Sequence, residues 1–168
     1  MGPSGSGKST LLRVLAGFLK PLNGEVYVSK SIATVSQDLR LLPHLSAIQN
    51  IAAPLIIRGE APQPSLRKAK SMLADLKLPE IGNRPAKFLS QGQAQRVAFA
   101  RALAMETELL MLDEPTSALD EENAELILRL LKNWLTPERS ILMITHQKEI
   151  ADWSNRTLRI QQGALETT

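Results

Sequence analysis

The stretch Met1-Gly2-Pro3-Ser4-Gly5-Ser6-Gly7-Lys8-Ser9-Thr10 decides the fold. Its spacing, G-x-x-x-x-G-K-S, is typical of a phosphate-binding loop, and the apolar residues that follow recur at helical spacing over 11–15. Glycines leave backbone N–H groups free to surround phosphate oxygens, and the helix that follows adds the positive end of its dipole. The stretch therefore predicts a nucleotide-binding α/β protein.

Within this loop we expect each residue from Gly2 to Thr10 to contact bound ATP. The residues are Gly2, Pro3, Ser4, Gly5, Ser6, Gly7, Lys8, Ser9 and Thr10. The Lys8 ammonium should reach the β- and γ-phosphates, and the Ser9 hydroxyl should coordinate Mg²⁺. The alternative is a flexible Gly/Ser-rich segment, which the helical pattern after it disfavours.

The composition indicates one globular domain. The chain has 168 residues, of which 43% are hydrophobic and 22% charged, so it can bury a sizeable core. The absence of cysteine excludes disulfides and thiolate metal sites. The net charge is +3, and only Arg67, Lys68 and Lys70 form a dense basic group, which we interpret as a solvated helix face. No nucleic-acid partner is expected.

The first half of the chain contains β-like and then helical patterns. Residues 25–28 and 32–35 flank Ser29-Lys30-Ser31, which is short enough for a hairpin. Ser46 and Gln49 form a capping-box pattern for a helix that Pro54 should kink or end.

Two prolines then divide the helical region. Pro62 and Pro64 are expected in a loop, and a second helix is expected from Ser65 until shortly before Pro79.

The second half alternates helix and strand. A helix opens at Ser90, an apolar strand covers 109–112, and a further helix carries Glu121 and Glu122 in its first turn. Another strand over 141–144, a short helix and a last strand over 157–160 follow. This alternation predicts an α/β fold with a mainly parallel sheet.

Four motifs occur in one order along the chain: the phosphate loop, Gln37, Leu89-Ser90-Gln91-Gly92-Gln93 with Asp113-Glu114, and His146. Together they resemble an ABC-type ATPase over nearly the whole chain. The resemblance implies a single P-loop NTPase domain over 1–168, with a helical insert subdomain at about 44–104. It also implies that the antiparallel N-terminal part of the family is truncated here.

The resemblance implies roles for four residues outside the phosphate loop. Asp113 resembles the acidic residue that holds Mg²⁺ through water, and Glu114 resembles the general base. Gln37 resembles the glutamine that senses Mg²⁺, which makes Ser9, Gln37 and Asp113 the expected metal site. His146 resembles the histidine that hydrogen-bonds the γ-phosphate. The alternative for Asp113-Glu114-Pro115 is an acidic turn that ends a strand.

The resemblance also implies residues that act across a dimer. Ser90, Gln91, Gly92 and Gln93 resemble the signature that binds the γ-phosphate of the partner subunit, with Gln91 in place of the first glycine. That replacement is costly only where the position requires a positive φ. Asp120 resembles a residue of the loop that crosses the interface. The alternatives are an ordinary capping box at Ser90 and Gln93, and a helix cap at Asp120.

The predicted function is that of the ATP-binding subunit of an ABC transporter, with ATP and Mg²⁺ as cofactors. The subunit is expected to form a head-to-tail dimer, to drive transmembrane permease subunits, and to lie at the cytoplasmic face of the inner membrane. One alternative is a non-catalytic fragment or remnant, and the other is an ABC ATPase that acts on nucleic acid or the ribosome. Substrate and direction of transport stay open.

A phosphate loop must be held at the end of a central strand, and no such stretch precedes Met1. We therefore expect these residues to belong to a longer protein that starts upstream. The missing strand is expected between the strands that end at Leu112 and Ile144, whose backbone groups would be left unpaired. The 168 residues alone should express poorly and hydrolyse ATP weakly or not at all.

Overall fold

A computed structural model describes residue 2, residues 5–147, residue 150 and residues 154–161 and 163–167. Its α-helices are α1 (Lys8–Leu15), α2 (Ala47–Ile57), α3 (Pro62–Asp75), α4 (Gln91–Ala104) and α5 (Glu121–Trp134), and two short 3-10 helices cover Pro79–Ile81 and Ala86–Phe88. Its strands are β1 (Ile32–Val35), β2 (Leu109–Asp113), β3 (Ser140–Ile144), β4 (Leu158–Gln161) and β5 (Ala164–Thr167).

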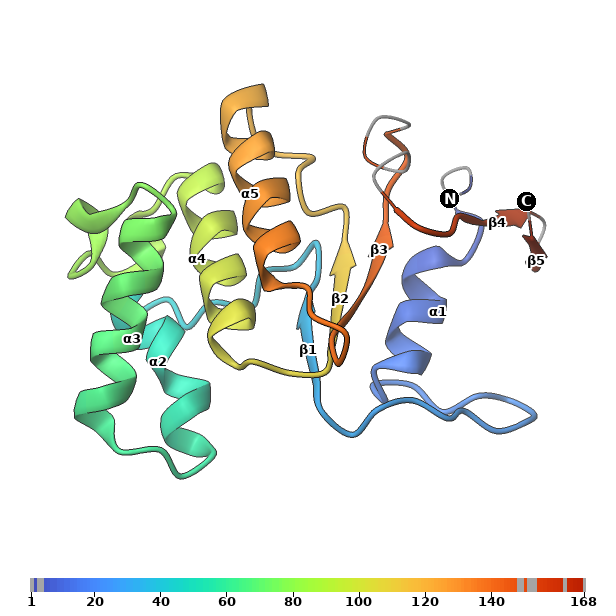
Figure 1. Ribbon diagram of the computed structural model, residues 1–168, viewed down its shortest axis with the longest axis horizontal. Helices are drawn as coiled ribbons and strands as arrows, with labels where there is room; N and C mark the ends of the chain where they lie inside the picture. Colours follow the sequence, from blue (N-terminus) through green and yellow to red (C-terminus); the bar gives the residue numbers. More distant parts are fainter. Residues whose placement is uncertain (1, 3–4, 148–149, 151–153, 162, 168) are drawn as a thin grey trace.

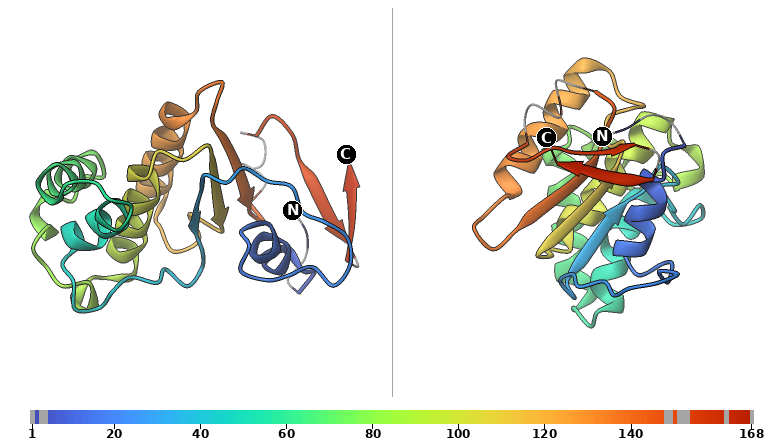
Figure 2. Two further views of the ribbon diagram at one scale, coloured as in Figure 1. Left: turned by 90° about the horizontal axis from the view of Figure 1, so that it is seen from below. Right: turned by 90° about the vertical axis from the view of Figure 1, so that its right-hand side faces the viewer.

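The central sheet is parallel and has the order β1-β2-β3. Figures 1 and 2 show α4 and α5 on one face of this sheet and α1 on the other, with α2 and α3 beyond α4. The expected α/β fold is confirmed.

Parallel pairing brings three strand ends to one edge of the sheet. Val35 pairs with Leu112, and Asp113 pairs with Ile144. Residues that follow β1, β2 and β3 therefore emerge side by side, at the edge where open α/β sheets bind ligands.

Helix α4 lies at the centre of the hydrophobic core. Val97 and Phe99 are fully buried, and they belong to the same cluster as Leu110 and Leu112 of β2 and residues of α2 and α3. Burial of one such side chain contributes about 1.5–3 kcal/mol. The core therefore fixes α4 against both the sheet and the neighbouring helices.

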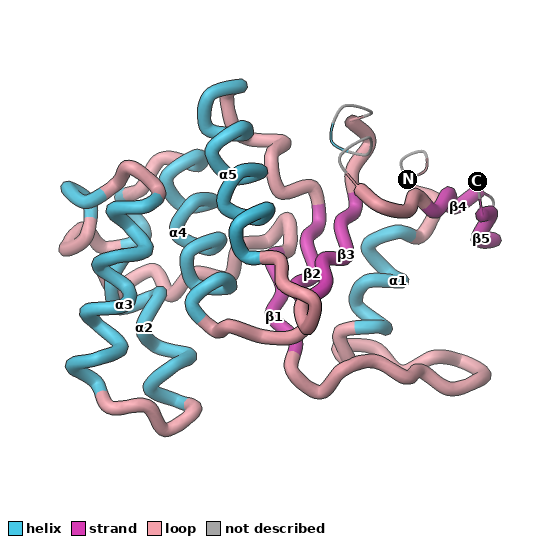
Figure 3. The backbone as a smooth tube through the Cα atoms, viewed as in Figure 1, coloured by secondary structure: helices cyan, strands magenta, loops and turns pink. Residues whose placement is uncertain are grey.

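The expected hairpin is wrong. Residues 25–28 form no strand, and β1 pairs in parallel with β2 instead (Figure 3). The register buries Ala33 and Val35 against the core, whereas Tyr27 is 86% exposed. Burial of β1 beside β2 gains more than a two-stranded hairpin, which is marginal in water.

Prolines are placed differently from the expectation. Helix α2 continues through Pro54, whose neighbours Ile51 and Leu55 are fully buried, so packing outweighs the missing backbone bond. Helix α3 begins at Pro62 rather than at Ser65, because the first helical position needs no N–H donor.

The capping boxes and the later elements agree better with the sequence. Both boxes, at Ser46 with Gln49 and at Ser90 with Gln93, are present, and the strands expected over 109–112 and 141–144 are confirmed. The expected strand over 157–160 is β4, which turns at Gly163 into an antiparallel β5. The short helix expected after His146 lies mostly outside the described residues.

The strands that end near Leu112 and Ile144 are direct neighbours, so no third strand can lie between them as expected. Among the described strands, β3 forms one edge of the sheet. Its free side faces a groove of about 300 Å³, lined by apolar residues of α1, β3 and β4 that include Leu12, Leu142 and Ile160. This apolar groove therefore lies between β3 and β4, along the edge of β3 that pairs with no described strand.

Asn50 holds the entry to α2 and gives a test of this packing. The side chain is 1% exposed and accepts a bond from Leu42 N at 2.7 Å. Its amide also donates to the carbonyl oxygens of Leu42, Leu45 and Ser46. We expect Asn50→Ala to lower the free energy of unfolding by about 2–4 kcal/mol, because buried backbone groups lose their partners.

Urea denaturation measures this loss. Asn83→Ala, at an exposed position, is the control and should change stability by less than about 0.5 kcal/mol. Equal effects of the two substitutions would contradict the assignment.

Candidate active site

A cleft of about 520 Å³ lies at the C-terminal ends of the parallel strands. It is lined by residues of the loop before α1, of the first turn of α1 and at the ends of all three parallel strands: Gly2, Gly5, Gly7, Lys8, Ser9, Thr10, Gln37, Asp113, Glu114 and His146. Pro3 and Ser4, also expected to contact ATP, lie outside the described residues. The fold thus brings together residues more than 100 positions apart in the sequence.

The first turn of α1 lines this cleft. Gly7 is the N-cap, with a left-handed φ of 94°, and it offers no side-chain cap. The first turn carries no acidic residue. The positive end of the helix dipole therefore favours an anion at this turn.

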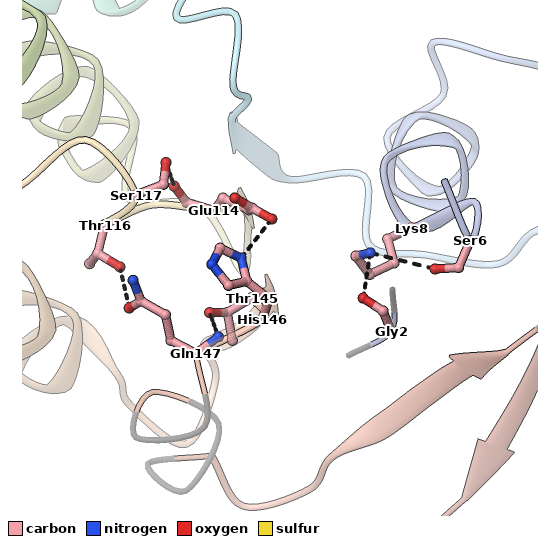
Figure 4. Close-up of polar contacts among 9 residues, drawn as sticks. All are labelled: Gly2, Ser6, Lys8, Glu114, Thr116, Ser117, Thr145, His146 and Gln147. Atoms are coloured by element: carbon pink, nitrogen blue, oxygen red, sulfur yellow. Dashed lines mark hydrogen bonds and ion pairs between the residues drawn. The ribbon is translucent and has the colours of Figure 1, made fainter. Parts of the chain in front are cut away.

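Lys8 is folded back over the loop. Its Nζ donates to the Gly2 carbonyl oxygen at 2.7 Å and to Ser6 Oγ at 3.5 Å (Figure 4). A Cβ on Gly2 would lie 2.3 Å from the Ile160 carbonyl oxygen, so this end of the loop packs directly on β4. The ammonium is thereby held at the mouth of the loop, where a phosphate would enter.

Hydrogen bonds fix the backbone of Glu114 through both its N–H and its carbonyl oxygen. Its φ is +50°, a left-handed conformation that costs a residue other than glycine about 1–3 kcal/mol. Its N–H donates to the Ile144 carbonyl oxygen at 2.9 Å, and its carbonyl oxygen accepts from Ser117 N and Oγ. Its Oε1 lies 3.0 Å from His146 Nδ1, as Figure 4 shows. Neighbouring β3 and the turn after β2 therefore fix this carboxylate beside the cleft.

Three oxygen-bearing side chains fit a hard cation. Ser9, Gln37 and Asp113 all line the cleft. Asp113 is 8% exposed, and its carboxylate makes no hydrogen bond or ion pair with the residues described here. Oxygen donors of this kind suit Mg²⁺. The described residues contain no group of three or more His, Cys, Asp and Glu side chains placed to hold a metal ion.

The expected signature residues lie elsewhere. Ser90 caps α4, and in this single chain Ser90 and Gln93 do form the alternative capping box, with Gln93 N donating to Ser90 Oγ at 3.3 Å. None of the residues 90–93 is among the described residues that line the cleft. Gln91 is exposed and has no positive φ, so it replaces glycine without backbone strain.

Asp120 also lies outside the cleft lining and caps α5. Its Oδ1 accepts from Asn123 N at 2.9 Å, as the capping alternative requires. The bond from the Asn123 backbone, followed by those from its side-chain amide, lowers the pKa of Asp120. The carboxylate form is therefore stabilised by the folded chain.

Two residues of α4 are not singled out by any motif. Gln95 donates through Nε2 to the Pro115 carbonyl oxygen at 2.6 Å, and Arg101 donates to the carbonyl oxygens of Leu39 and Arg40 at 2.6 and 2.8 Å. Burial lowers the pKa of Arg101. A polar residue four positions before Phe99, on the buried face of the helix, is the signal that identifies Gln95.

Comparison with known protein families decides the relationship. The family described as "ABC transporter" matches residues 1–117, which is more than half of the chain. The chain belongs to the ABC transporter family. The cleft residues listed above lie within the matched region, except His146.

Relatives within the ABC transporter family are similar along the whole chain. An uncharacterized ABC transporter ATP-binding protein of Methanocaldococcus jannaschii, MJ0796, is 35% identical over 99% of this chain and 80% of its own length. The lipoprotein-releasing system ATP-binding protein LolD of Saccharophagus degradans is 37% identical over 98% of this chain and 80% of its own. A spermidine/putrescine import ATP-binding protein PotA of Pseudomonas aeruginosa is 39% identical, but the match covers 49% of its length.

Solved ABC cassettes share the fold. A dimeric post-hydrolysis state of the MJ0796 cassette bound to ADP and Pi has a TM-score of 0.91 and 33% identity, covering 99% of this chain and 83% of that one. A putative metal-chelate type ABC transporter in an inward-facing conformation has a TM-score of 0.85 and 30% identity, covering 100% and 70%. These values confirm the cassette architecture.

The Asp120 cap gives a pH-dependent prediction. Because the folded pKa is lowered, the stability that the cap contributes is fully present above the usual Asp pKa of about 3.9 and is lost as pH falls through the folded value. Asn also caps helices but does not titrate. We expect the thermal midpoint of the wild type, relative to Asp120→Asn, to fall between pH 6 and pH 3. A constant difference between the two midpoints would contradict this account.

Proposed function

We propose that this chain binds ATP with Mg²⁺ and hydrolyses it to drive transport through membrane partner subunits. One observation carries the proposal: a single cleft contains a phosphate loop at a helix N-terminus, a buried Asp113 and a Glu114–His146 pair. The chain's ABC family membership supports the same reaction class.

Within this proposal each residue has a separate task. Lys8 and the loop N–H groups bind the β- and γ-phosphates, while Ser9, Gln37 and Asp113 would hold Mg²⁺. Mg²⁺, when bound, neutralises charge on the phosphate oxygens. Glu114 orients the attacking water and accepts its proton.

His146 lies next to the proposed base. Its Nδ1 is within hydrogen-bond distance of Glu114 Oε1. A protonated imidazole can donate through both ring nitrogens, so His146 can hold Glu114 through Nδ1 and a γ-phosphate oxygen through Nε2. This arrangement would align base, water and phosphate.

Two substitutions separate binding from hydrolysis. Glu114→Gln should leave ATP affinity within about 3-fold and lower kcat by about 100-fold or more, because only the proton acceptor is lost. Lys8→Ala should abolish measurable ATP binding, because the phosphates lose their point charge. Steady-state hydrolysis and nucleotide titration, both made on the full-length protein, measure the two effects.

Glu122→Gln is the matched control, since Glu122 is exposed on α5 and pairs only with Lys77 among the described residues. It should hydrolyse ATP like the wild type. Near-normal hydrolysis by Glu114→Gln would remove the base assignment. A wild type that binds ATP without turnover would favour a non-catalytic remnant.

We further propose a head-to-tail dimer in which Ser90 of one subunit meets the γ-phosphate held by the other. Ser90 is exposed at the start of α4, and residues 90–93 are absent from the described lining of their own cleft. A second helix N-terminus aimed at the same phosphate from the partner would repeat the anion-binding logic of α1. The MJ0796 cassette, similar to this chain, has been solved as a dimer.

Dimerisation should therefore need ATP. We expect Glu114→Gln protein to sediment as a dimer with saturating Mg-ATP and as a monomer without it. The double variant Glu114→Gln/Ser90→Arg should stay monomeric, because a bulky side chain blocks the approach of α4 to the phosphate. A Glu114→Gln protein that remains monomeric with Mg-ATP would exclude this arrangement.

The proposed membrane partner is a transmembrane permease, and the proposed location is the cytoplasmic face of the inner membrane. Within the described part of the chain, no helix has the length and apolar character needed to span a bilayer. Relatives are named for lipoprotein release, polyamine import and arginine transport, so neither cargo nor direction is assigned. Copurification with a transmembrane subunit from solubilised membranes tests this proposal. If no transmembrane subunit copurifies with the chain, the proposed membrane partner is wrong.

A further inference from the structure

Helix α4 touches both loops that carry the proposed catalytic residues. Near its N-terminus, Gln95 bonds to Pro115, and a Cβ added at Gly92 would lie at van der Waals distance from Ala118 and Leu119. Near its C-terminus, Arg101 bonds to the backbone just beyond Gln37. One rigid, buried element therefore links the turn after Glu114 with the segment after β1.

The contact at Gln95 is the closest of these to the reacting groups. Gln95 is 5% exposed, and its Nε2 donates to the Pro115 carbonyl oxygen at 2.6 Å. Pro115 follows Glu114 directly and is itself buried. Since proline has no N–H, this carbonyl is the one backbone group of residue 115 that a neighbour can hold.

Glu114 needs such support. Its left-handed φ of +50° persists only where surrounding contacts fix it. The Ile144 carbonyl oxygen fixes its N–H, and Ser117 fixes its carbonyl oxygen from within the same turn. Gln95 adds a bond to this turn from a separate helix.

We propose that Gln95 is a positioning residue for the general base. Its amide ties α4 to the Pro115 carbonyl, and this bond keeps the Glu114 carboxylate at the cleft beside His146. The inference rests on the proposed ATPase function. It also connects Ser90, at the start of α4, to the base of the same subunit through about one and a half turns of helix.

The oxygen atom of the Gln95 amide argues against a purely structural role for this residue. Gln95 Oε1 is buried and has no hydrogen-bond partner among the described residues. A buried acceptor without a partner destabilises the fold, and an apolar side chain of similar length would fill the space without that cost. The donor to Pro115 is therefore what glutamine contributes here that methionine cannot.

Gln95→Met tests the proposal, because methionine has similar length and lacks the donor. We expect kcat for ATP hydrolysis to fall by about 10- to 100-fold while KM stays within about 3-fold, since the phosphate cradle is untouched. The thermal midpoint should change little, because the substitution removes the unpaired Oε1 but also leaves the Pro115 carbonyl oxygen without its donor. Gln63→Met, on the exposed first turn of α3, is the control and should behave like the wild type.

Hydrogen exchange of residues 114–120 provides a readout that does not require turnover. It should become faster in Gln95→Met, while exchange in α2 and α3 stays unchanged. Unchanged kcat, or a lower kcat with unchanged exchange at 114–120, would overturn the proposal. So would faster exchange throughout the helices together with a lower thermal midpoint, which would indicate general destabilisation.

The two proposals can fail separately. If the wild type does not hydrolyse ATP, the proposed function fails, and hydrogen exchange alone decides the role of Gln95. Faster exchange confined to 114–120 would then still support the brace between α4 and the turn, and unchanged exchange would overturn it.

Discussion

The parallel pairing of β2 with both of its neighbours is the constraint on which the cleft depends. β2 is an almost fully buried strand, so its register with β1 and β3 is fixed by burial as well as by backbone hydrogen bonds. A slip of one residue would turn the Asp113 side chain to the other face of the sheet, away from the cleft. The chemistry at the sheet edge therefore follows from the packing of apolar residues beneath it.

Helix α4 connects the sheet to the helices beyond it. Eight of its residues, Gln95 among them, are buried, so the helix cannot shift without disturbing the contacts of Phe99 and its neighbours. Because α4 also begins at Ser90, an event at its N-terminus would reach the turn after Glu114 through a rigid element. Helix α4 would thus link the contact of Ser90 with the partner's γ-phosphate, as the dimer proposal has it, to the position of Glu114 in its own subunit.

The two edges of β3 have different neighbours. One edge is fully paired with β2, and the other faces the apolar groove between α1 and β4. Gly2 packs against the Ile160 backbone at the rim of this groove, so the phosphate loop is anchored to β4 as well as to α1. The position of the loop thus depends on how the groove is filled and on the placement of β4.

Local sequence determined the elements with strong signals of their own. The loop from Gly2 to Ser9, the capping boxes and the apolar strands 109–112 and 141–144 were predicted because spacing and periodicity act over a few residues. Residues 25–28 and Pro54 were misjudged, because the partner of β1 and the core around α2 are remote in sequence. Only the tertiary structure placed Gln95 under Pro115 and β3 beside β2. Such contacts depend on which surfaces are buried together, and local sequence patterns do not specify which remote segments pack against one another.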